Sequence, residues 1–304
     1  MAEHRKRSAL RIGISGWRYA PWRGRFYPDG LPQARELAYA SRQVCTVEIN
    51  GTFYSLQRPE SFIRWRDDTP GGFVFAVKGP RFITHTLRLR DVEEPLANFL
   101  ASGVLALREK LGPILWQLPP TLRWDAASIE AFLDLLPRDT LAAARLARRH
   151  GARMRGRSVT DTDAKRPLRH ALEIRHPSFA CPEFVATLRQ RGIALVTADT
   201  AGKWPVLEDA TADFAYVRLH GDKALYRSGY SAGAIADWAR RIDAWSRGAT
   251  PRGARLAGSR AKAAGPRDVY CYFDNDVKVM APRDARALMS ALRLPMQPVP
   301  HNAG

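Results

Sequence analysis

The sequence has few cysteines, few lysines and no long uncharged apolar run. The shortage of cysteines and of apolar runs argues against several classes of protein. Its 304 residues include three cysteines, Cys45, Cys181 and Cys271, which are far apart and lack CxxC spacing. This pattern predicts neither a disulfide framework nor a zinc ribbon. No segment approaches the roughly 20 apolar residues of a membrane span, and the N-terminus lacks the apolar core of a signal peptide. We therefore expect a cytoplasmic protein with no membrane partner.

Arginine rather than lysine supplies the net charge of +18. Of the 48 basic residues 8 are lysine and 40 are arginine. A charge of this sign and size favours binding to phosphates and nucleic acids. Two segments concentrate it, 145–169 and 250–267, and the second has the glycine, alanine and proline content of a flexible loop. Nucleic acid stays open as a partner beside the alternative that the arginines reflect a compositional bias.

Short apolar runs with β-strand character alternate with segments of helical periodicity along the chain. The strand-like runs are 11–17, 46–54, 73–79, 113–119, 171–176, 193–200, 214–221 and 268–276. The helical segments are 31–42, 59–67, 95–110, 126–136, 182–191, 232–246 and 282–292. Strands that alternate with helices form parallel sheets, and eight such units in about 300 residues are typical of a closed barrel. The sequence therefore predicts an α/β fold, a single TIM-like (β/α)8 barrel.

This barrel is expected to fill residues 11–292, between a basic tail at 1–10 and a C-terminal tail at 293–304. The segment around 145–169 is interpreted as a basic insertion, and the connection between the sixth and seventh strands is short and irregular. No GxGxxG motif follows the first strand. The absence of this motif argues against a dinucleotide-binding fold.

Polar residues recur at alternate positions of the predicted strands. In a barrel one face of each strand meets the helices and the other fills the interior, so charged side chains are expected to point inward. The inward set is Glu48, Asn50, Lys78, Gln117, Glu173, Arg175, Thr197, Asp199, Arg218 and His220. These residues lie near the carboxyl ends of their strands, where TIM barrels build active sites. In the eighth strand either Phe273 and Asn275 or Tyr272, Asp274 and Asp276 point inward.

Several motifs are long and contain rare residues in a fixed order: GISGWRYAPWRGRFYP, TVEINGTFY, FAVKGPRFITH, LWQLPP, LEIRHPSF, YVRLHGD and YFDND. In these motifs the chain resembles the YecE-like proteins, the domain of unknown function 72 family, from Arg11 to about Leu292. The resemblance implies a TIM-like barrel with a polar pocket at its carboxyl end, and it implies no reaction. It adds Tyr54, His85 and Asn275 to the pocket. The loop 250–267 and the phrase FDNDVKVMAP depart from the family pattern, which leaves the contacts from that rim open.

The candidate site combines carboxylates with cations. Arg175 and Arg218 suit a carboxylate or phosphate group held by two hydrogen bonds, so the expected partner is a small anionic molecule, phosphorylated or nucleotide-like. The predicted catalytic residues, in acid/base roles or with Lys78 as a covalent nucleophile or an anion ligand, are Glu48, Lys78, Glu173, Asp199 and His220. The predicted substrate-binding residues are Asn50, Tyr54, His85, Gln117, Arg175, Arg218, Tyr226, Tyr230 and Asn275. The alternative is that the charges form an ion-pair network that braces the barrel.

Two further features of the sequence are a set of residues with metal-ligand chemistry and a segment with the composition of a mobile lid. Glu173, Asp199 and His220 follow on consecutive strands and have the chemistry of metal ligands, but neighbouring cations would repel a metal ion, so none is favoured. No cofactor motif is present. The segment 225–231 has the composition of a lid, with Tyr226 and Tyr230 flanking Gly229. The sequence favours an enzyme, a hydrolase or isomerase, over the alternative of an RNA-binding protein, and it leaves the oligomeric state open.

Overall fold

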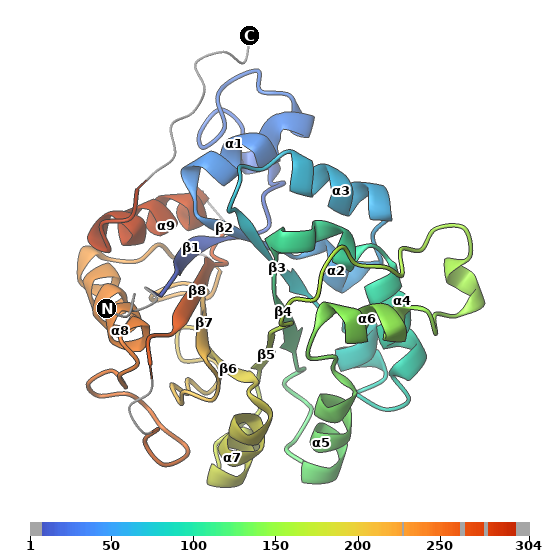
Figure 1. The fold of residues 1–304 in the computed structure, drawn as a ribbon. Helices are drawn as coiled ribbons and strands as arrows, with labels where there is room; N and C mark the ends of the chain where they lie inside the picture. Colours follow the sequence, from blue (N-terminus) through green and yellow to red (C-terminus); the bar gives the residue numbers. More distant parts are fainter. Residues whose placement is uncertain (1–7, 227, 262–264, 277–278, 296–304) are drawn as a thin grey trace, which may run out of the picture.

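The computed structural model describes residues 8–226, 228–261, 265–276 and 279–295, and these form a closed parallel barrel (Figure 1). Its strands follow one another around the barrel in chain order: β1 (Leu10–Ser15), β2 (Thr46–Ile49), β3 (Val74–Lys78), β4 (Leu111–Gln117), β5 (His170–Glu173), β6 (Ala194–Asp199), β7 (Phe214–Leu219) and β8 (Asp268–Phe273). Pairing between β1 and β8, with Ile12 opposite Cys271, closes the sheet. The predicted TIM-like fold is therefore confirmed.

Helices surround the barrel on its outer side (Figure 1). They are α1 (Glu36–Gln43), α2 (Gly51–Tyr54), α3 (Pro59–Asp67), α4 (Glu93–Ala101), α5 (Ala126–Leu135), α6 (Thr140–Ala147), α7 (Pro182–Arg191), α8 (Ala232–Ser246) and α9 (Met280–Ala291). The described residues 200–213, which connect β6 to β7, contain no helix, in agreement with the irregular connection expected there. Within the described ranges, no helix has the length and apolarity needed to cross a membrane.

Local sequence explains where several helices begin. Pro59 and Pro182 open α3 and α7, where the missing N–H of proline costs no hydrogen bond. The Asp139 side chain accepts a hydrogen bond of 2.8 Å from the Ala142 N–H and caps α6. Helix α6 reaches into the start of the segment 145–169, whose interpretation as a basic insertion stays a prediction. Residues 51–54, predicted as the end of a strand, turn into α2.

The hydrophobic core has two parts. One lies between the strands and the surrounding helices, and the other fills the inside of the barrel. The interior cluster is Ala76, Leu115, Ala171, Ala194, Val196, Ala198, Phe214, Tyr216, Tyr270 and Tyr272. Packing there leaves no spare room beside β1, because a Cβ on Gly13 would lie 1.8 Å from the carbonyl oxygen of Thr46. The interior of the barrel is therefore filled at this level, and the space for a ligand inside the barrel lies at its carboxyl end.

The alternation of β6 is opposite to the predicted one. Ala194, Val196 and Ala198 point into the barrel, so Thr197 and Asp199 point outward. The Thr197 hydroxyl donates a hydrogen bond of 2.9 Å to the Leu207 carbonyl in the connection that replaces a helix. Because that connection offers backbone polar groups instead of an apolar helix face, polar side chains suit the outer face of β6.

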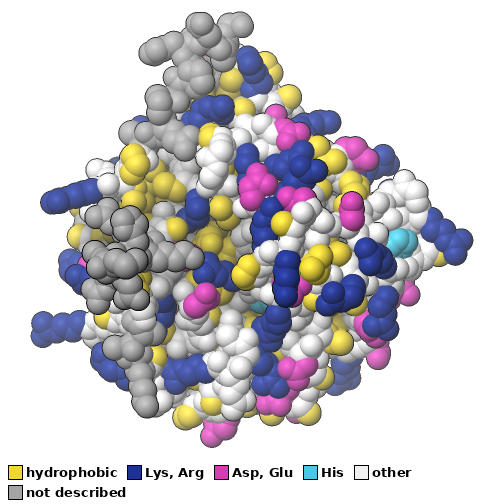
Figure 2. All heavy atoms as spheres, viewed as in Figure 1, with side chains coloured by type: hydrophobic (Ala, Val, Ile, Leu, Met, Phe, Trp, Pro, Cys, Tyr) yellow, Lys and Arg dark blue, Asp and Glu magenta, His cyan; other side chains and the backbone are white. Residues whose placement is uncertain are grey.

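Basic side chains are scattered over the surface. In the face drawn in Figure 2, Lys and Arg side chains alternate with acidic, hydrophobic and other residues and do not form one continuous patch. Many arginines also have acidic partners, as in the pairs of Arg191 with Asp134 at 2.7 Å and Arg166 with Asp163 at 2.7 Å. Exposed pairs of this kind contribute little to stability.

Candidate functional site

A cavity of about 610 Å³ opens at the carboxyl end of the barrel. We call it the mouth pocket. Its lining residues are Tyr19, Asn50, Phe53, Tyr54, Lys78, Arg81, His85, Gln117, Arg175, Tyr226, Asp274 and Asp276. They come from the ends of strands and from the segments that follow them, which is where TIM barrels place their ligands.

Beneath the mouth pocket a single arginine binds three carboxylates. Arg218 is fully buried at the end of β7, and its guanidinium lies 2.9 Å from Glu48 Oε1, 2.8 Å from Glu173 Oε2 and 2.8 Å from Asp274 Oδ2. Glu48 also accepts hydrogen bonds from the hydroxyl groups of Ser15 and Tyr216. We call Arg218, Glu48, Glu173 and Asp274 the buried ion network.

The buried ion network keeps its carboxylates ionised. Burial alone would raise the pKa of Glu173, but the positive charges of Arg218 and Arg175 outweigh it and hold that pKa well below the usual range. At Asp274 burial is again opposed by Arg218, and the pKa falls to about 2. Both groups therefore stay negative at neutral pH and hold the arginines in place.

Glu173 connects the network to the wall of the mouth pocket. Its Oε1 atom accepts hydrogen bonds from Gln117 Nε2 at 2.8 Å and from Arg175 Nε at 3.1 Å. The Arg175 guanidinium also stacks on the Trp204 ring, with its central carbon 3.9 Å from the ring centroid. Arg175 is thus oriented by a buried carboxylate and an aromatic face while it lines the cavity.

Lys78 ends β3 and lines the same cavity. Its side chain is buried, its Nζ atom lies 4.1 Å from the centroid of the Phe53 ring, and it has no ion pair or hydrogen bond to the described residues. Burial first, and then the charge of Arg218, lower the pKa of Lys78 to about 8. An amine with this pKa exchanges a proton readily near neutral pH.

His85 lines the pocket as a neutral imidazole. Burial and the charges of Arg175 and Lys78 lower its pKa to about 4. Its Nδ1 atom lies 2.8 Å from the Thr84 hydroxyl, and its ring packs edge-on against Phe53. His85 therefore offers an uncharged hydrogen-bonding group among cations.

His220 lies under the pocket and does not line it. The side chain is fully buried, with Nε2 3.4 Å from Arg218 Nη1 and Nδ1 3.1 Å from Asp274 Oδ2, although the second contact lacks the geometry of a hydrogen bond. Because arginine can only donate, Nε2 must accept in the first contact, which places the proton of a neutral ring on Nδ1.

The structure places three of the predicted site residues neither in the lining of the mouth pocket nor in the buried layer directly below it. Asp199 points to the outer side of β6 and accepts a hydrogen bond of 3.0 Å from the Tyr230 hydroxyl. Asn275 donates to Asp284 at 2.8 Å and to the Ser228 carbonyl at 2.9 Å. Asp199, Tyr230 and Asn275 thus join the packing around the loop that follows β7.

The three residues with metal-ligand chemistry, Glu173, Asp199 and His220, do not form one site. Asp199 is on the opposite side of the sheet from Glu173 and His220, so these three residues do not converge on one point. In the described ranges, no group of three or more His, Cys, Asp or Glu side chains is placed to hold a metal ion.

The other predicted residues divide into two layers. Lining the mouth pocket are Asn50, Tyr54, Lys78, His85, Gln117, Arg175 and Tyr226. Fully buried below it are Glu48, Glu173, Arg218 and His220. The lid predicted at 225–231 contributes Tyr226, whose hydroxyl lies 3.5 Å from Arg175 Nη2, and Arg227 falls outside the described residues.

Sequence reasoning missed three lining residues, Tyr19, Phe53 and Arg81, and left Asp274 and Asp276 as one of two alternatives for the eighth strand. Asp274 had a usable signal, because Arg218 requires an acidic partner on a neighbouring strand and the eighth strand offers one in a single register. Phe53 reaches the pocket since α2 turns the chain toward the mouth, which strand alternation does not predict. Tyr19 and Arg81 lie on segments after β1 and β3, where no periodicity applies.

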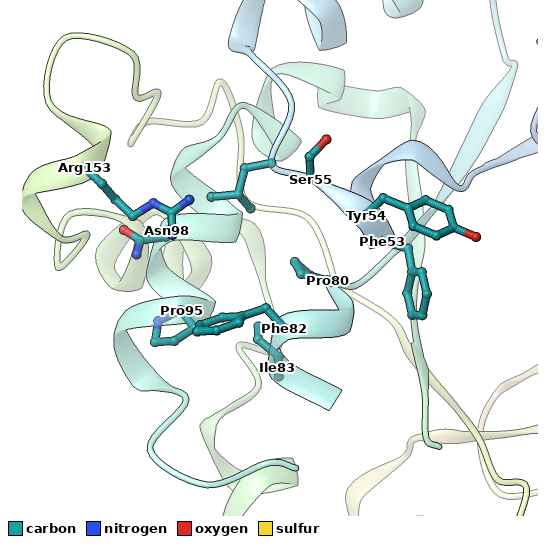
Figure 3. A pocket seen from close by; sticks show the side chains of 10 residues that line it. Phe53, Tyr54, Ser55, Pro80, Phe82, Ile83, Pro95, Asn98 and Arg153 are labelled. Atoms are coloured by element: carbon teal, nitrogen blue, oxygen red, sulfur yellow. The ribbon is translucent and has the colours of Figure 1, made fainter. Parts of the chain in front are cut away.

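Two smaller cavities adjoin the mouth pocket. One of about 200 Å³ shares Phe53 and Tyr54 with it and is mainly apolar, with Phe82 and Ile83 on one side and Arg153 beside Asn98 at the far end (Figure 3). The other, of about 260 Å³, shares Tyr19 and Asn50 with it and includes the side chains of Trp17, Trp65 and Gln57. Asn50 Oδ1 is buried there without a hydrogen-bond partner among the described residues.

Comparison with known proteins identifies the family of the chain but no reaction. The model of the family described as "Protein of unknown function DUF72" matches residues 11–303. The UPF0759 protein YecE of Escherichia coli K12 is 32% identical over 127 residues, which are 41% of this chain and 44% of that protein. The chain thus matches less than half the length of this curated relative.

Two solved structures share the fold. A DUF72 family protein from Thermotoga maritima superposes with a TM-score of 0.69 at 23% identity, over 94% of this chain and 99% of that one. A DUF72 family protein from Enterococcus faecalis gives a TM-score of 0.69 at 17% identity, over 96% and 100% of the two chains. These identities support the likeness of fold alone. Together with the family match they confirm the resemblance seen in the sequence, and the chain belongs to the DUF72, or YecE-like, family.

Proposed function

We propose that the protein is an enzyme that binds an anionic substrate, phosphorylated or nucleotide-like, in the mouth pocket and transforms it by acid/base or hydrolytic chemistry. The observation that carries this proposal is Lys78, a buried amine without a counterion among the described residues. It shares the cavity with Arg81 and Arg175. Arg175 is paired with Glu173, and Asp274 and Asp276 also line the cavity. Lys78 has no such pair among the described residues, and a bound phosphate or carboxylate group would supply its counterion.

The acid/base role falls to Lys78 because its pKa of about 8 lies close to neutral pH. At pH 7 roughly one amine in ten is neutral and able to accept a proton, while the rest can donate one. The same property suits a covalent role for Lys78 with a carbonyl substrate. His85, held neutral by its lowered pKa, can accept or donate a hydrogen bond to the substrate without repelling a cationic neighbour.

The buried ion network has a positioning role in this proposal. Glu173 fixes Arg175 and Gln117, and Arg218 fixes Glu173. Asp274 belongs both to the network and to the pocket lining, so it is the ionised carboxylate that a substrate can contact. A catalytic site of this design keeps its charges in place before the substrate arrives, which avoids reorganisation during the reaction.

The two adjoining cavities favour a substrate larger than a simple anion. The Trp17 and Trp65 side chains with Asn50 and Gln57 offer aromatic surface and amide groups, and the unpartnered Asn50 oxygen calls for a hydrogen-bond donor. A nucleobase provides a planar ring and, in several bases, an amino donor. This is the feature that points to nucleotide-like molecules.

Turnover of a defined panel tests the proposal. Nucleoside monophosphates, sugar phosphates and phosphorylated carboxylic acids would be incubated with the protein and the products followed by ³¹P NMR and mass spectrometry. We expect one class to be converted by the wild type, and conversion to fall at least 100-fold in Lys78→Met. Lys165→Met, which changes a lysine whose side chain is 69% exposed, serves as the matched control and keeps wild-type turnover. Equal turnover by Lys78→Met and the wild type would refute the role of Lys78.

RNA binding remains the second candidate because one observation favours it. Arg145, Arg148, Arg153, Arg155 and Arg157 are all exposed, and Arg153 lines the apolar cavity beside the mouth pocket. Binding of a polyanion by such a surface weakens log-linearly with salt, whereas a small anion in the mouth pocket is held by partly buried groups and is less sensitive. Titrating a single-stranded RNA at two salt concentrations separates the two candidates.

A further inference from the structure

A second cavity of about 720 Å³ lies at the opposite, amino-terminal end of the barrel. It is bordered by the end of α7, by residues 210–213 before β7 and by residues 265–267 before β8. Four charged residues line it, namely Arg189, Asp213, Arg260 and Arg267. None of them belongs to the mouth pocket or to the buried ion network.

Arg267 is the unusual residue of this cavity. Arg267 is 5% exposed, and its Nε atom is buried without a hydrogen-bond partner among the described residues. Among the described residues no acidic group lies within 4.0 Å of its guanidinium, whereas the buried Arg218 has three carboxylates. A buried cation without a counterion is strongly unfavourable, so a missing negative partner is the simplest physical explanation.

The neighbouring charges do not supply that partner. Asp213 lies 3.0 Å from Arg169, which also binds Asp268 at 2.7 Å. Arg189 lies 3.7 Å from Asp209, whose carboxylate also accepts hydrogen bonds from two backbone N–H groups. Burial, and then the charge of Arg189, lower the pKa of Arg267, which is the direction expected for a cation that has only another cation nearby.

We propose that this cavity is an oxyanion site in which Arg267, with Arg260 at its edge, binds a phosphate group of a small molecule. Arginine suits this ligand because its planar guanidinium donates parallel hydrogen bonds to two oxygens of one phosphate. A small molecule is favoured over a polynucleotide since Arg267 is nearly enclosed and only a compact group can reach it. The site is independent of the function proposed for the mouth pocket.

The thermal midpoint of unfolding in phosphate and in chloride, at equal ionic strength, tests the site. We expect phosphate to raise the midpoint of the wild type. In Arg267→Met this rise is expected to be lost, while the midpoint in chloride is higher than that of the wild type because the uncompensated charge has been removed. Arg35→Met, at an exposed arginine elsewhere, is the matched control and keeps both wild-type values.

Phosphate can also bind the mouth pocket, so the measurement is repeated in Arg175→Met. The part of the phosphate effect that survives there is assigned to the amino-terminal site and must vanish in the double variant Arg175→Met with Arg267→Met. If Arg267→Met does not fold, Arg260→Met replaces it, and at least a tenfold weakening of phosphate binding by calorimetry is expected.

Two results would overturn the oxyanion site. One is a lower midpoint for Arg267→Met in chloride together with a full phosphate response, which would mean that the arginine has a structural partner. The other is stabilisation by a short single-stranded RNA but not by phosphate, lost in Arg267→Met, which would assign the cavity to a polynucleotide.

Discussion

Arg218 is fully buried at the centre of the barrel and forms ion pairs with three carboxylates, those of Glu48, Glu173 and Asp274. The cost of burying one guanidinium and three carboxylates is offset only while all of them are present. Removing the arginine would leave three buried negative charges without their common partner. Removing one carboxylate leaves less uncompensated buried charge.

Arg218→Met is therefore expected to lower the free energy of unfolding by about 3–5 kcal/mol, the range for breaking a buried pair. Urea denaturation followed by circular dichroism measures this. Arg42→Met, at a half-buried arginine outside the network, is the control and should lower the free energy of unfolding much less. A loss below about 1 kcal/mol for Arg218→Met would mean that the network does not hold the charges together.

The pH dependence of stability follows from the lowered pKa values. Asp274, with a folded-state pKa of about 2, contributes stability that is fully present above the unfolded-state value near 4 and is lost as the pH falls toward 2. In Arg218→Met the carboxylates lack their counterion and should protonate more easily. The difference in stability between wild type and variant is thus expected to shrink between pH 5 and pH 2, and a constant difference would contradict this.

Lys78 gives a prediction that needs no substrate. Because its pKa is lowered to about 8, the neutral amine should appear in the folded protein as the pH rises through 8. Labelling with trace acetic anhydride from pH 6 to pH 11, quantified by peptide mass spectrometry against the exposed Lys165, measures the midpoint. Unfolding in urea should move the midpoint to the ordinary lysine value of about 10.4, and a midpoint above 10 in the folded protein would contradict the proposed acid/base role.

At the scale of the elements, strand alternation predicted most of the inward residues because barrel strands have two unlike faces. It was wrong at β6, where Thr197 and Asp199 point outward, since the connection to β7 presents a backbone carbonyl instead of an apolar helix. The Tyr230 hydroxyl, from the loop after β7, donates a hydrogen bond to Asp199 on the same outer side. It could not choose a register for β8, because both alternatives mix aromatic and polar residues. Tyr272 and Asp274 point inward, and Arg218 supplies the reason.

Short connecting elements were predicted less well than strands. Helix α2 has four residues and no amphipathic period, yet it brings Phe53 and Tyr54 to the mouth pocket. Helix α6 was not predicted because its alanines and Arg145 adjoin the arginine-rich segment 145–169, although Asp139 marks its start. Strand alternation therefore predicted the site residues at strand ends. Tyr54, His85 and Tyr226, which lie beyond the strands, were predicted from the family resemblance and from the composition of 225–231.

Close packing of neighbouring strands predicts the effect of a change in β1. Gly13 sits beside Thr46, and a methyl group there would lie 1.8 Å from the Thr46 carbonyl oxygen. Gly13→Ala should lower the free energy of unfolding by about 3 kcal/mol through forced separation of the strands. Gly71→Ala, where a methyl group meets nothing within 4 Å, is the control and should change it by less than about 0.5 kcal/mol.

For the whole molecule, the barrel places two cationic cavities at opposite ends of one solid core. The mouth pocket contains Lys78, Arg81 and Arg175, and the amino-terminal cavity contains Arg260 and Arg267. The net charge of +18 attracts anions to both ends, but it does not by itself create a site, because most arginines are scattered or paired. Burial and missing counterions distinguish these two cavities from the rest of the basic surface.

Scattered arginines also predict how the whole molecule responds to salt. Association with a nonspecific single-stranded RNA should be lost between about 50 and 200 mM salt, with a log-linear slope. Binding of a small phosphorylated ligand in the mouth pocket should weaken far less over the same range. Fluorescence anisotropy with labelled RNA and calorimetry with the ligand measure the two, and RNA binding that persists at 200 mM salt would favour an RNA-binding function.

Native mass spectrometry of the gently purified protein decides whether the mouth pocket holds an anion. The wild type is expected to retain a small anionic molecule that can be extracted and identified, Arg175→Met is expected to lose it, and Arg35→Met to keep it. A wild-type protein that carries no such molecule even after incubation with the phosphorylated panel, or one that keeps it equally well in Arg175→Met, would contradict an anion-binding active site at the mouth of the barrel.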